Sequence, residues 1–325
     1  MLKRTISLAR FALLGITFAS AQACMASDYP NKPIKMVIPY TPGGSIDTVG
    51  RMVADQLQRQ LGQPIVIENQ PGASGVLGSL NVKKAKADGY TLLFNASSQV
   101  YMPLVVAKKT YDAEQDFTPV GQIGYVPLVV AVNNDVPAKS LSEFATLAKA
   151  NPGKYTWATS GLGTTSHLSE EMINRALKLD MEIIAYKGAV PQLTDVVGGH
   201  VSAAVSPMPG VRSFVQAGRL RALAVTSKSR VANMPDVPTV AESGIPGFEL
   251  LSWYGIWGPA EMPVAVTNRL NAEIAKAVDT PALKAKFAEL SFVPAKGNPE
   301  QFRKLIREDL SKIGQAVKEA NIKID

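Results

Sequence analysis

Cysteine and histidine are almost absent from this sequence, with one Cys and two His among 325 residues. A single Cys cannot form an intramolecular disulfide, and three Cys and His residues in all are too few for a Cys/His zinc site. We therefore expect no metal centre. Hydrophobic residues make up 46% and charged residues 19% of the chain, which is ordinary for a protein with a buried core and excludes intrinsic disorder.

Long hydrophobic runs are also missing, and the one notable apolar segment lies near the start of the chain. A basic beginning is followed by the apolar segment 11–18, which is too short to cross a bilayer. The small residues 19–26 then offer a cleavage site after Ala23 or Ala26. We interpret residues 1–26 as an export signal peptide.

The single cysteine, Cys24, raises the alternative of a lipid anchor. Lipoprotein signals usually carry a bulky aliphatic residue three positions before the cysteine, whereas Ala21 stands there, so we favour cleavage without lipidation. Residues 1–26 hold three of the 34 basic and none of the 27 acidic residues, so without them the net charge falls from +7 to +4. An exported, mildly basic chain without cysteine is typical of a bacterial periplasm.

Clustered positive charge is lacking as well. The densest basic groups are Lys83-Lys84-Ala-Lys86 and Lys108-Lys109. The simplest interpretation of each is a solvated helix face or loop. Nucleic-acid binding would call for basic residues gathered on one face among stacking aromatics. We therefore expect no nucleic-acid partner.

Short apolar runs alternate with amphipathic stretches along the chain, which predicts an α/β fold with mostly parallel sheets flanked by helices. A capping box, Ser140 to Glu143, opens one of the helices. The expected strands are 34–40, 65–68, 90–94, 126–132, 154–159, 181–186, 201–205, 220–226 and 250–257. The expected helices are 46–57, 75–86, 141–150, 165–178, 189–198, 209–217, 263–278 and 299–319, with an irregular connection over 230–248.

Three strand ends open into loops of small residues that begin helices, namely 41–45, 71–75 and 160–166. A helix N-terminus presents unpaired N–H groups and a partial positive charge, and in open α/β sheets ligands bind at the carboxyl ends of the strands. Each loop alone could be a capped turn. Together, the three favour an anion held by backbone amides and hydroxyl groups.

Enzymatic signatures are weak. The segment Gly161–Ser166 imitates a dinucleotide fingerprint but has Ser where the third Gly belongs, and no Walker A motif or G-x-S-x-G occurs. His167 and Asp47 each follow a glycine loop at a helix start, where they would organise the loop rather than transfer protons. His200 follows two glycines in a turn, where we expect it to be exposed. We predict neither catalysis nor a cofactor.

Four aromatic residues fall at or near strand ends: Tyr40, Tyr101, Tyr186 and Trp253. Each could line a pocket for the body of an organic acid or simply pack in the core. A pocket role is better founded for Tyr40 and Tyr186 than for the other two.

Several motifs together resemble the Bug (TctC-type) substrate-binding proteins of tripartite tricarboxylate transporters. The resemblance runs from about Tyr29 to the C-terminus. It rests on Val37-Ile-Pro-Tyr-Thr-Pro-Gly-Gly-Ser-Ile-Asp47, Gly62-Gln-Pro-Ile-Val-Ile-Glu-Asn69, Gly72-Ala-Ser-Gly75, Ala87-Asp-Gly-Tyr-Thr-Leu-Leu93, Tyr186-Lys-Gly188 and Pro235-Asp-Val-Pro-Thr-Val-Ala-Glu242, and on the segment from Tyr155 to Leu168.

The resemblance implies a two-lobed periplasmic-binding-protein fold (type II-like) with the ligand in the cleft between the lobes. Lobe 1 would comprise 27–127 plus 250–325, and lobe 2 would comprise 128–249. Two crossing strands, near 120–132 and 251–258, would form the hinge.

The resemblance also implies a carboxylate gripped between the first two glycine loops through backbone amides and bridging waters. The third loop would contact the ligand from lobe 2, and the remaining residues would lie nearby or at its far end. Carried over to this chain, the ligand-binding residues are Thr41, Gly43, Gly44, Ser45, Gly72, Ala73, Ser74, Ser97, Ser98, Ser160, Thr164, Thr165 and Tyr186. The predicted ligand-binding set also includes Tyr40, as a strand-end aromatic residue, and Ser206, which is discussed next.

One departure from the family pattern concerns the end of the strand 201–205. Many relatives show Asp-Asn there, whereas this chain has Ser206-Pro207. An Asp would suit a ligand amine or hydroxyl group. Ser206 leaves the pocket less acidic, which favours a plain carboxylate, aliphatic or aromatic.

The sequence thus predicts a monomeric periplasmic solute-binding protein that delivers a small organic acid to a tripartite tricarboxylate-type secondary transporter. One alternative is a ligand sensor that presents the bound acid to a membrane two-component kinase. A further alternative is an exported hydrolase that uses His167.

Overall fold

The computed structural model describes residues 29–319 and 322, so the predicted signal peptide, residues 1–26, and Cys24 lie outside the described residues. The strands are β1 (Ile34–Ile38), β2 (Ile65–Asn69), β3 (Thr91–Ala96), β4 (Phe117–Asn133), β5 (Trp157–Thr159), β6 (Ile183–Ala185), β7 (Ala203–Pro207), β8 (Leu220–Val225), β9 (Leu251–Pro259) and β10 (Val293–Pro294). The helices are α2 (Ser45–Leu61), the 3₁₀ turn η1 (Ala73–Gly75), α3 (Val76–Lys83), α4 (Ser98–Val105), α5 (Leu141–Ala150), α6 (Thr165–Leu177), α7 (Ala189–Val197), α8 (Met208–Gln216), α9 (Val264–Asp279), α10 (Pro281–Glu289) and α11 (Pro299–Glu319).

The strands form one continuous path in the order β2-β1-β3-β9-β4-β7-β5-β6, with β8 and β10 also paired to β4. The outer strands β2, β1 and β3 are mutually parallel, as are β7, β5 and β6 at the other end. Between them β9 and β4 run antiparallel to their neighbours. The predicted α/β class is confirmed. The sheets are less parallel than predicted, because five of the nine strand pairings among the described residues are antiparallel and all five involve β4 or β9.

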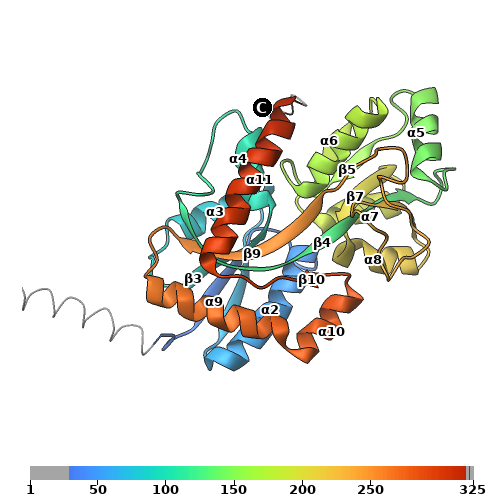
Figure 1. Cartoon of the computed structure of the whole chain (residues 1–325). Coiled ribbons are helices and arrows are strands. Elements are labelled where there is room, and N and C mark those ends of the chain that lie inside the picture. The colour runs from blue at the N-terminus through green and yellow to red at the C-terminus, as the bar shows by residue number, and fades with distance from the viewer. Residues whose placement is uncertain (1–28, 320–321, 323–325) are drawn as a thin grey trace, which may run out of the picture.

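The long strand β4 connects the two parallel groups, as Figure 1 shows. Its residues 117–127 pair with β9, and its residues 128–133 pair with β7 and β8. The register with β9 shifts between Pro119 and Gly121 and again between Gln122 and Gly124, which marks β-bulges that bend a strand. One continuous chain segment therefore belongs to both halves of the sheet.

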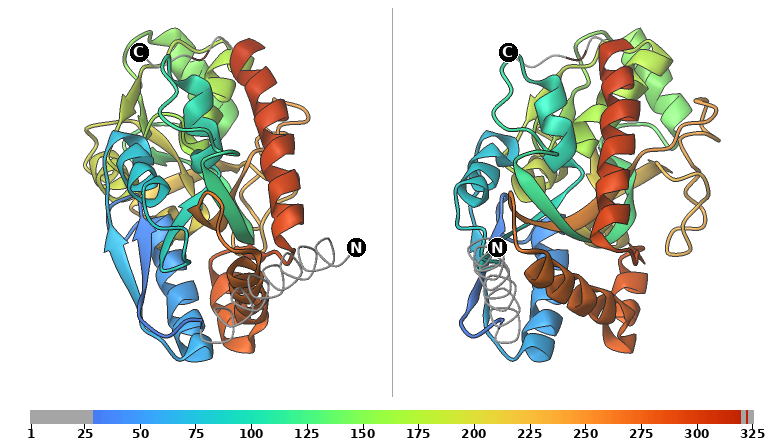
Figure 2. Two further views of the ribbon diagram at one scale, coloured as in Figure 1. Left: turned by 90° about the vertical axis from the view of Figure 1, so that its left-hand side faces the viewer. Right: turned by 60° about the vertical axis from the view of Figure 1, so that its left-hand side comes forward.

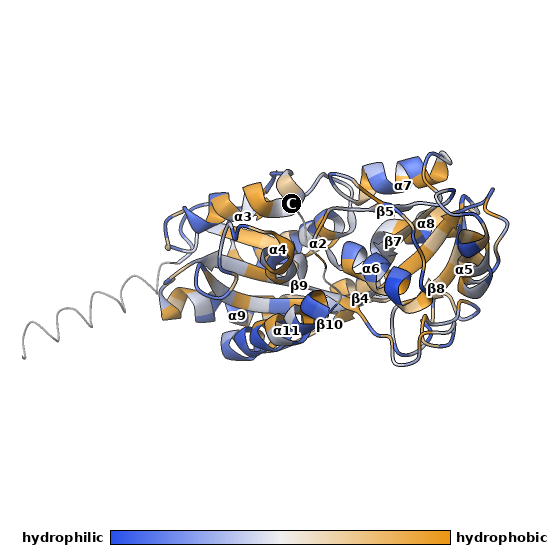
Figure 3. Ribbon diagram, turned by 90° about the horizontal axis from the view of Figure 1, so that it is seen from above, coloured by the Kyte–Doolittle hydropathy of each residue, from blue (hydrophilic) through white to orange (hydrophobic). Residues whose placement is uncertain are grey.

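Buried side chains form a hydrophobic layer on each face of the sheet. Along β1, Met36 and Ile38 belong to one layer and Val37 to the other, as the alternation of side chains in a strand requires. Helices α2, α7, α8, α9 and α10 cover the first layer, and α3, α4, α5, α6 and α11 cover the second. Figure 3 shows the helix ribbons alternating between hydrophilic and hydrophobic stretches, as expected for helices with one buried face.

Helix ends follow local chemistry. Helix α2 ends at Gly62, whose φ of 67° lies in the left-handed region that glycine adopts at low cost. Helix α5 spans the predicted 141–150, and Ser140 Oγ accepts the Glu143 N–H at 3.1 Å. The return bond of the capping box is displaced by one residue, because Glu143 accepts from the Lys139 N–H at 2.7 Å.

The structure differs from the predicted elements in four places. Helix α4 was not expected, and α3 ends at Lys83 rather than near Lys86. The C-terminal part holds three helices rather than two, because α10 lies between α9 and α11. Strand β4 begins at Phe117, well before the apolar run from which it was predicted. Figure 2 shows α11, in red, lying along the outside of the sheet.

Among the residues that the structure describes, no helix combines the length and apolar character needed to span a membrane.

Candidate functional site

The first glycine loop joins β1 to α2 and is organised by Asp47. One carboxylate oxygen of this buried residue accepts the Gly43 N–H at 2.9 Å and the Arg51 Nε–H at 2.8 Å. The other oxygen accepts from Asn69 Nδ2 at 2.8 Å. Burial opposes ionisation of Asp47, but these hydrogen bonds and the charge of Arg51 outweigh it and lower the pKa of the carboxyl below its ordinary value. Asp47 is therefore ionised, and both of its carboxylate oxygens are used in hydrogen bonds that hold the first loop in place.

The second glycine loop, between β2 and α3, is held in an unusual backbone conformation. Ala73 and Ser74 have φ of 44° and 52°, and Gly72 and Gly75 also have positive φ. The hydroxyl of Tyr40, at the end of β1, donates to the Ser74 carbonyl at 3.2 Å. It also lies 3.1 Å from Ser98 Oγ. Tyr40 thus joins the second loop to the start of α4.

The third loop, between β5 and α6, is closed by hydrogen bonds within itself. Thr164 is the N-cap of α6: its Oγ1 accepts the His167 N–H at 3.3 Å and donates to the Gly161 carbonyl at 2.7 Å. His167 Nδ1 accepts the Gly163 N–H at 3.3 Å. Burial lowers the pKa of His167 to about 4, so at neutral pH the ring is neutral and can accept this bond. Its geometry is that of a residue that braces the loop.

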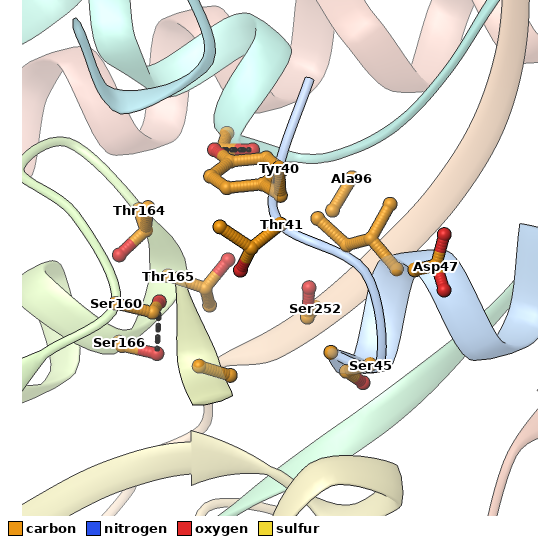
Figure 4. Close-up of a pocket in the computed structure, with 14 residues that line it drawn as sticks. Tyr40, Thr41, Ser45, Asp47, Ala96, Ser160, Thr164, Thr165, Ser166 and Ser252 are labelled. Carbon is orange, nitrogen blue, oxygen red and sulfur yellow. Dashed lines mark hydrogen bonds between the residues drawn. The ribbon is translucent and has the colours of Figure 1, made fainter. Parts of the chain in front are cut away.

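The first and third glycine loops meet around one cavity, shown in Figure 4. Its wall combines the first loop and the start of α2 with the end of β3, the start of α4, the third loop, and single residues of α7 and β9. The lining residues are Tyr40, Thr41, Gly44, Ser45, Ile46, Asp47, Ala96, Ser98, Ser160, Thr164, Thr165, Ser166, Ala189 and Ser252.

A second, larger chamber adjoins this cavity, and Tyr40 and Ser160 line both. The second glycine loop supplies one side of it, and the segment after β6 supplies the other. The remaining lining residues are Gly72, Ala73, Ser74, Gly75, Ala185, Tyr186 and Lys187. The Tyr186 hydroxyl donates to Asp195 Oδ2 at 2.7 Å, and burial together with this carboxylate raises the pKa of Tyr186 to about 12.

Residues from the two halves of the sheet touch across the cavity. Ser97, before α4, hydrogen-bonds Thr165 at the start of α6 with 2.8 Å between the hydroxyl oxygens. A Cβ atom built on Gly188 would lie 2.6 Å from Thr41 Oγ1, and one on Gly161 would lie 3.2 Å from Ser74 Oγ. The two halves of the sheet therefore approach each other closely around the cavity.

The polar lining consists mainly of hydroxyl groups and loop backbone. Thr41 Oγ1 is buried and has no hydrogen-bond partner among the described residues, whereas the Ser45 hydroxyl is 2.7 Å from that of Tyr254. The single carboxylate of the wall, Asp47, already accepts three hydrogen bonds. A free donor beside a helix N-terminus, with the only lining carboxylate neutralised, suits an anionic group.

The structure brings most of the predicted residues to the two cavities, with three exceptions. Gly43 does not line them and donates its N–H to Asp47. Ser97 is fully buried and reaches the site only through Thr165. Ser206 pairs with Val129 in the sheet and is fully buried outside both linings.

The other two aromatic candidates, Tyr101 and Trp253, belong to the core. Both donate to Asp309 Oδ2 of α11, each at 2.6 Å, and neither lines the cavities. His200 is exposed, as expected.

Several lining residues were missed by the sequence analysis. Ser166 lies inside the third loop motif, and Lys187 and Ala189 flank Gly188 of the Tyr-Lys-Gly motif, so each could have been included by extending a motif already noticed. Ser252 gives a subtler signal, because it is a lone polar residue near the start of an otherwise apolar strand.

The residues in 29–319 and at 322 include no cluster of three or more His, Cys, Asp or Glu side chains suited to a metal ion.

Comparison with known proteins gives a consistent result. The model of the tripartite tricarboxylate transporter family receptor, TctC, matches residues 49–322. Protein BugT of Bordetella pertussis is 36% identical over 321 residues, which cover 96% of this chain and 98% of BugT.

Solved structures agree. Rpa4515 of R. palustris, solved with adipate, superposes with a TM-score of 0.88 at 31% identity, over 91% of this chain and 99% of that protein. MatC (Rpa3494) of Rhodopseudomonas palustris, solved with bound malate, gives a TM-score of 0.84 at 29% identity, over 89% and 100% of the two chains.

Proposed function

Because the chain belongs to the TctC family of tripartite tricarboxylate transporter receptors, we propose that it captures a small organic carboxylate and delivers it to a three-component secondary transporter. The family is one of transport receptors with the periplasmic-binding-protein fold, which agrees with the expectation of a binding protein rather than an enzyme. We further propose that the protein acts in the periplasm.

The observation that carries the proposal is the cavity between the first and third glycine loops. It contains the Thr41 hydroxyl, which has no hydrogen-bond partner among the described residues, and the carboxylate of Asp47, which already accepts three hydrogen bonds. A carboxylate there would accept from Thr41 Oγ1 and from loop N–H groups near the start of α2. The adipate and malate bound by the two Rhodopseudomonas proteins support this ligand class.

We propose that hinge closure is the mechanism of capture. In this proposal residues 27–127 plus 250–325 form one lobe and 128–249 the other, with β4 and β9 as the connecting strands. A ligand that touches loops of both lobes favours the closed arrangement over the open one. The Ser97–Thr165 hydrogen bond and the close approach of Thr41 to Gly188 support this proposal, because each joins one proposed lobe to the other.

A ligand sensor for a membrane kinase would use the same pocket. The delivery role is preferred because the matching family model is that of a transporter receptor. A hydrolase built on His167 is disfavoured, because its neutral ring is committed to the Gly163 N–H.

The grip can be tested at Gly44, which lines the cavity and has an ordinary φ of −76°. A Cβ there would meet nothing closer than 3.7 Å, so Gly44→Ala should fold and keep most of the affinity. Gly44→Asp adds a charge that repels a carboxylate and should lower its affinity by at least about 30-fold, since ~2 kcal/mol corresponds to that factor.

The measurement begins with a thermal-shift screen of mono-, di- and tricarboxylates, because a ligand that binds the folded state raises its melting temperature. Calorimetric titration of the best ligand then compares the wild type, Gly44→Ala and Gly44→Asp. Equal affinities for the two variants would contradict the first loop as the carboxylate grip. A wild type that binds none of the acids would contradict the proposed function itself.

A further inference from the structure

The second glycine loop, residues 72–75, adopts a backbone conformation that two of its own residues disfavour. Ala73 and Ser74 have φ of 44° and 52°, in the left-handed region that residues other than glycine rarely occupy. Such a conformation persists where the surrounding structure holds it in place. The carbonyl groups of Ser74 and Gly75 accept hydrogen bonds from side chains outside the loop. The loop is therefore held at these two carbonyls.

Ser79 of α3 connects the Gly75 carbonyl to Gln99 of α4. Its Oγ lies 3.0 Å from the Gly75 carbonyl oxygen and 2.6 Å from Gln99 Oε1. Both Ser79 and Gln99 are fully buried, and a hydrogen bond that is shielded from water is stronger than one that is exposed. This connection therefore couples the position of the loop to that of Gln99.

Tyr40 connects the Ser74 carbonyl to the same amide through two further residues. The Tyr40 hydroxyl lies 3.1 Å from Ser98 Oγ, which donates to Asn95 Oδ1 at 3.2 Å. The Nδ2 group of Asn95 then donates to Gln99 Oε1 at 3.0 Å. The Gln99 oxygen thus closes a continuous path of hydrogen bonds from one loop carbonyl to the other.

The backbone of Gln99 is itself anchored from outside α4. Pro103, four residues later, has no N–H to donate to the Gln99 carbonyl, and the Tyr111 hydroxyl donates to this carbonyl instead, at 3.0 Å. The Gln99 Nε2 group is buried without a hydrogen-bond partner in residues 29–319 and 322. Because an unpaired buried donor costs stability, the Gln99 side chain contributes through its oxygen.

We propose that Gln99 is a positioning residue for the ligand site, because its Oε1 holds the second glycine loop in its left-handed conformation. Gln99 lines neither cavity, whereas the loop and Tyr40 do, so it acts on a ligand only through them. The effect on ligand affinity rests on the proposed function. The effect on the loop does not, and it can be measured without a ligand.

Hydrogen exchange of the ligand-free protein, measured by mass spectrometry over residues 70–80, tests the hold on the loop. Gln99→Met keeps the length of the side chain but removes the oxygen. It should speed exchange over 70–80 by about fivefold, the factor that corresponds to one typical hydrogen bond, and leave α5 unchanged. Ser79→Ala breaks the same path by a smaller change, so it should act in the same direction.

A conservative variant separates the oxygen from the rest of the side chain. Gln99→Glu keeps an oxygen at the position of Oε1 and replaces only the Nε2 group, which has no partner among the residues described. At pH 5, where burial favours the protonated acid, its exchange over 70–80 should match that of the wild type.

Calorimetric titration with the best carboxylate of the screen tests the effect on the site. Gln99→Met should weaken binding by about fivefold. Asn271→Leu is the matched control, since it removes a half-buried amide of α9 that bonds the carbonyls of Val120 and Gly297, and it should leave the affinity unchanged. When Tyr40→Phe and Gln99→Met are combined, the loss should differ from the product of the single losses by at least about twofold, because members of one network do not act independently.

Unchanged exchange over 70–80 in both Gln99→Met and Ser79→Ala would overturn the proposal, whatever the protein binds. An affinity loss in Gln99→Met no larger than in Asn271→Leu would do the same, as would losses in Gln99→Met and Tyr40→Phe that simply multiply. A wild type that binds no carboxylate would contradict the proposed function, and the exchange measurement would still decide whether Gln99 holds the loop.

Discussion

Glu170 is a fully buried carboxylic acid on α6, beneath the third glycine loop. Its Oε1 accepts the Val205 N–H at 3.0 Å, while Oε2 has no partner among the described residues. On the opposite face of the sheet, Gln192 of α7 donates to the carbonyls of Ala158 and Val205. Gln192 thus links β5 to β7, and Glu170 joins α6 to β7. Burial raises the pKa of Glu170 well above its ordinary value, which favours the protonated, neutral form of the group.

The raised pKa of Glu170 gives a pH-dependent stability. As pH rises above ~4.3, the ordinary pKa of a glutamic acid, the unfolded chain releases this proton before the folded chain does, so the folded state binds more protons and loses stability. Glu170→Gln removes this linkage. Above pH ~4.3 the variant should gain stability relative to the wild type, by up to roughly 1.4 kcal/mol per pH unit, until the pH passes the raised pKa of the folded state.

Urea denaturation at several pH values measures this difference, with exposed Glu182→Gln as the control for net charge. If the free energy of unfolding changed with pH in the same way for the wild type and Glu170→Gln, Glu170 would have to be ionised in the folded protein.

At the scale of elements, helix α3 shows how the first two glycine loops are brought together. A Cβ on Gly78 would lie 2.8 Å from Pro39 Cβ and 3.0 Å from its Cα, so α3 packs directly on the backbone that follows β1. This contact sets the distance between the second loop and Tyr40. The absence of a side chain at Gly78 therefore helps to position the site.

Gly78→Ala should destabilise the protein, because overpacking of about 1–3 kcal/mol exceeds the gain of about 1 kcal/mol in helix propensity. It should also weaken carboxylate binding several-fold by displacing the second loop. Gly314→Ala in α11 is the control, since its Cβ would make an ordinary contact of 3.7 Å with Leu104, and it should stabilise the protein. Chemical denaturation and calorimetry measure both effects, and a stabilised Gly78→Ala would refute the close packing.

Local patterns predicted most elements of this fold, and the misses have physical reasons. Helix α4 is short and contains Pro103, so no amphipathic repeat could develop. Strand β4 begins among Pro119, Gly121 and Gly124, where bulges replace regular alternation. Helix α10 does start with the capping signal Thr280-Pro281, which is readable from sequence.

The site was less predictable than the elements, because proximity between distant segments leaves no local pattern. The glycine loops could be expected at strand ends, but the approach of Ser252 and Ala189 to them depends on how β9 and α7 pack. Ser206 is the opposite case. Its position after a predicted strand suggested that it lines the pocket, but it pairs with Val129 of β4 and is buried within the sheet.

At the scale of the whole molecule, the proposed closure brings the two halves together at Gly188. A Cβ there would lie 2.6 Å from Thr41 Oγ1, and its φ of 132° is also unfavourable for other residues. Gly188→Ala should therefore lower the stability and, by holding the halves apart, weaken every ligand by at least about tenfold. Calorimetry with the best carboxylate measures the loss of affinity.

Gly153→Ala is the control that distinguishes backbone strain from a block to closure. Gly153 also has a positive φ, 74°, but no atom lies within 4 Å of the added Cβ. It should lower the melting temperature and leave the affinity unchanged. If both variants bind equally well, contact at Gly188 does not limit closure.

The three tryptophans of the chain are all buried, with Trp253 and Trp257 on β9 and Trp157 on β5. Trp253 and Trp257 lie 5.9 Å apart between ring centroids, and the indole N–H of Trp253 is bonded to Asp309. Indoles shielded from water emit at shorter wavelengths than exposed ones, and their emission responds to small changes in nearby polar groups. Because β9 pairs with the long strand that belongs to both halves of the sheet, the proposed hinge closure should change the emission of Trp253 and Trp257, so that ligand capture could be followed optically without a label.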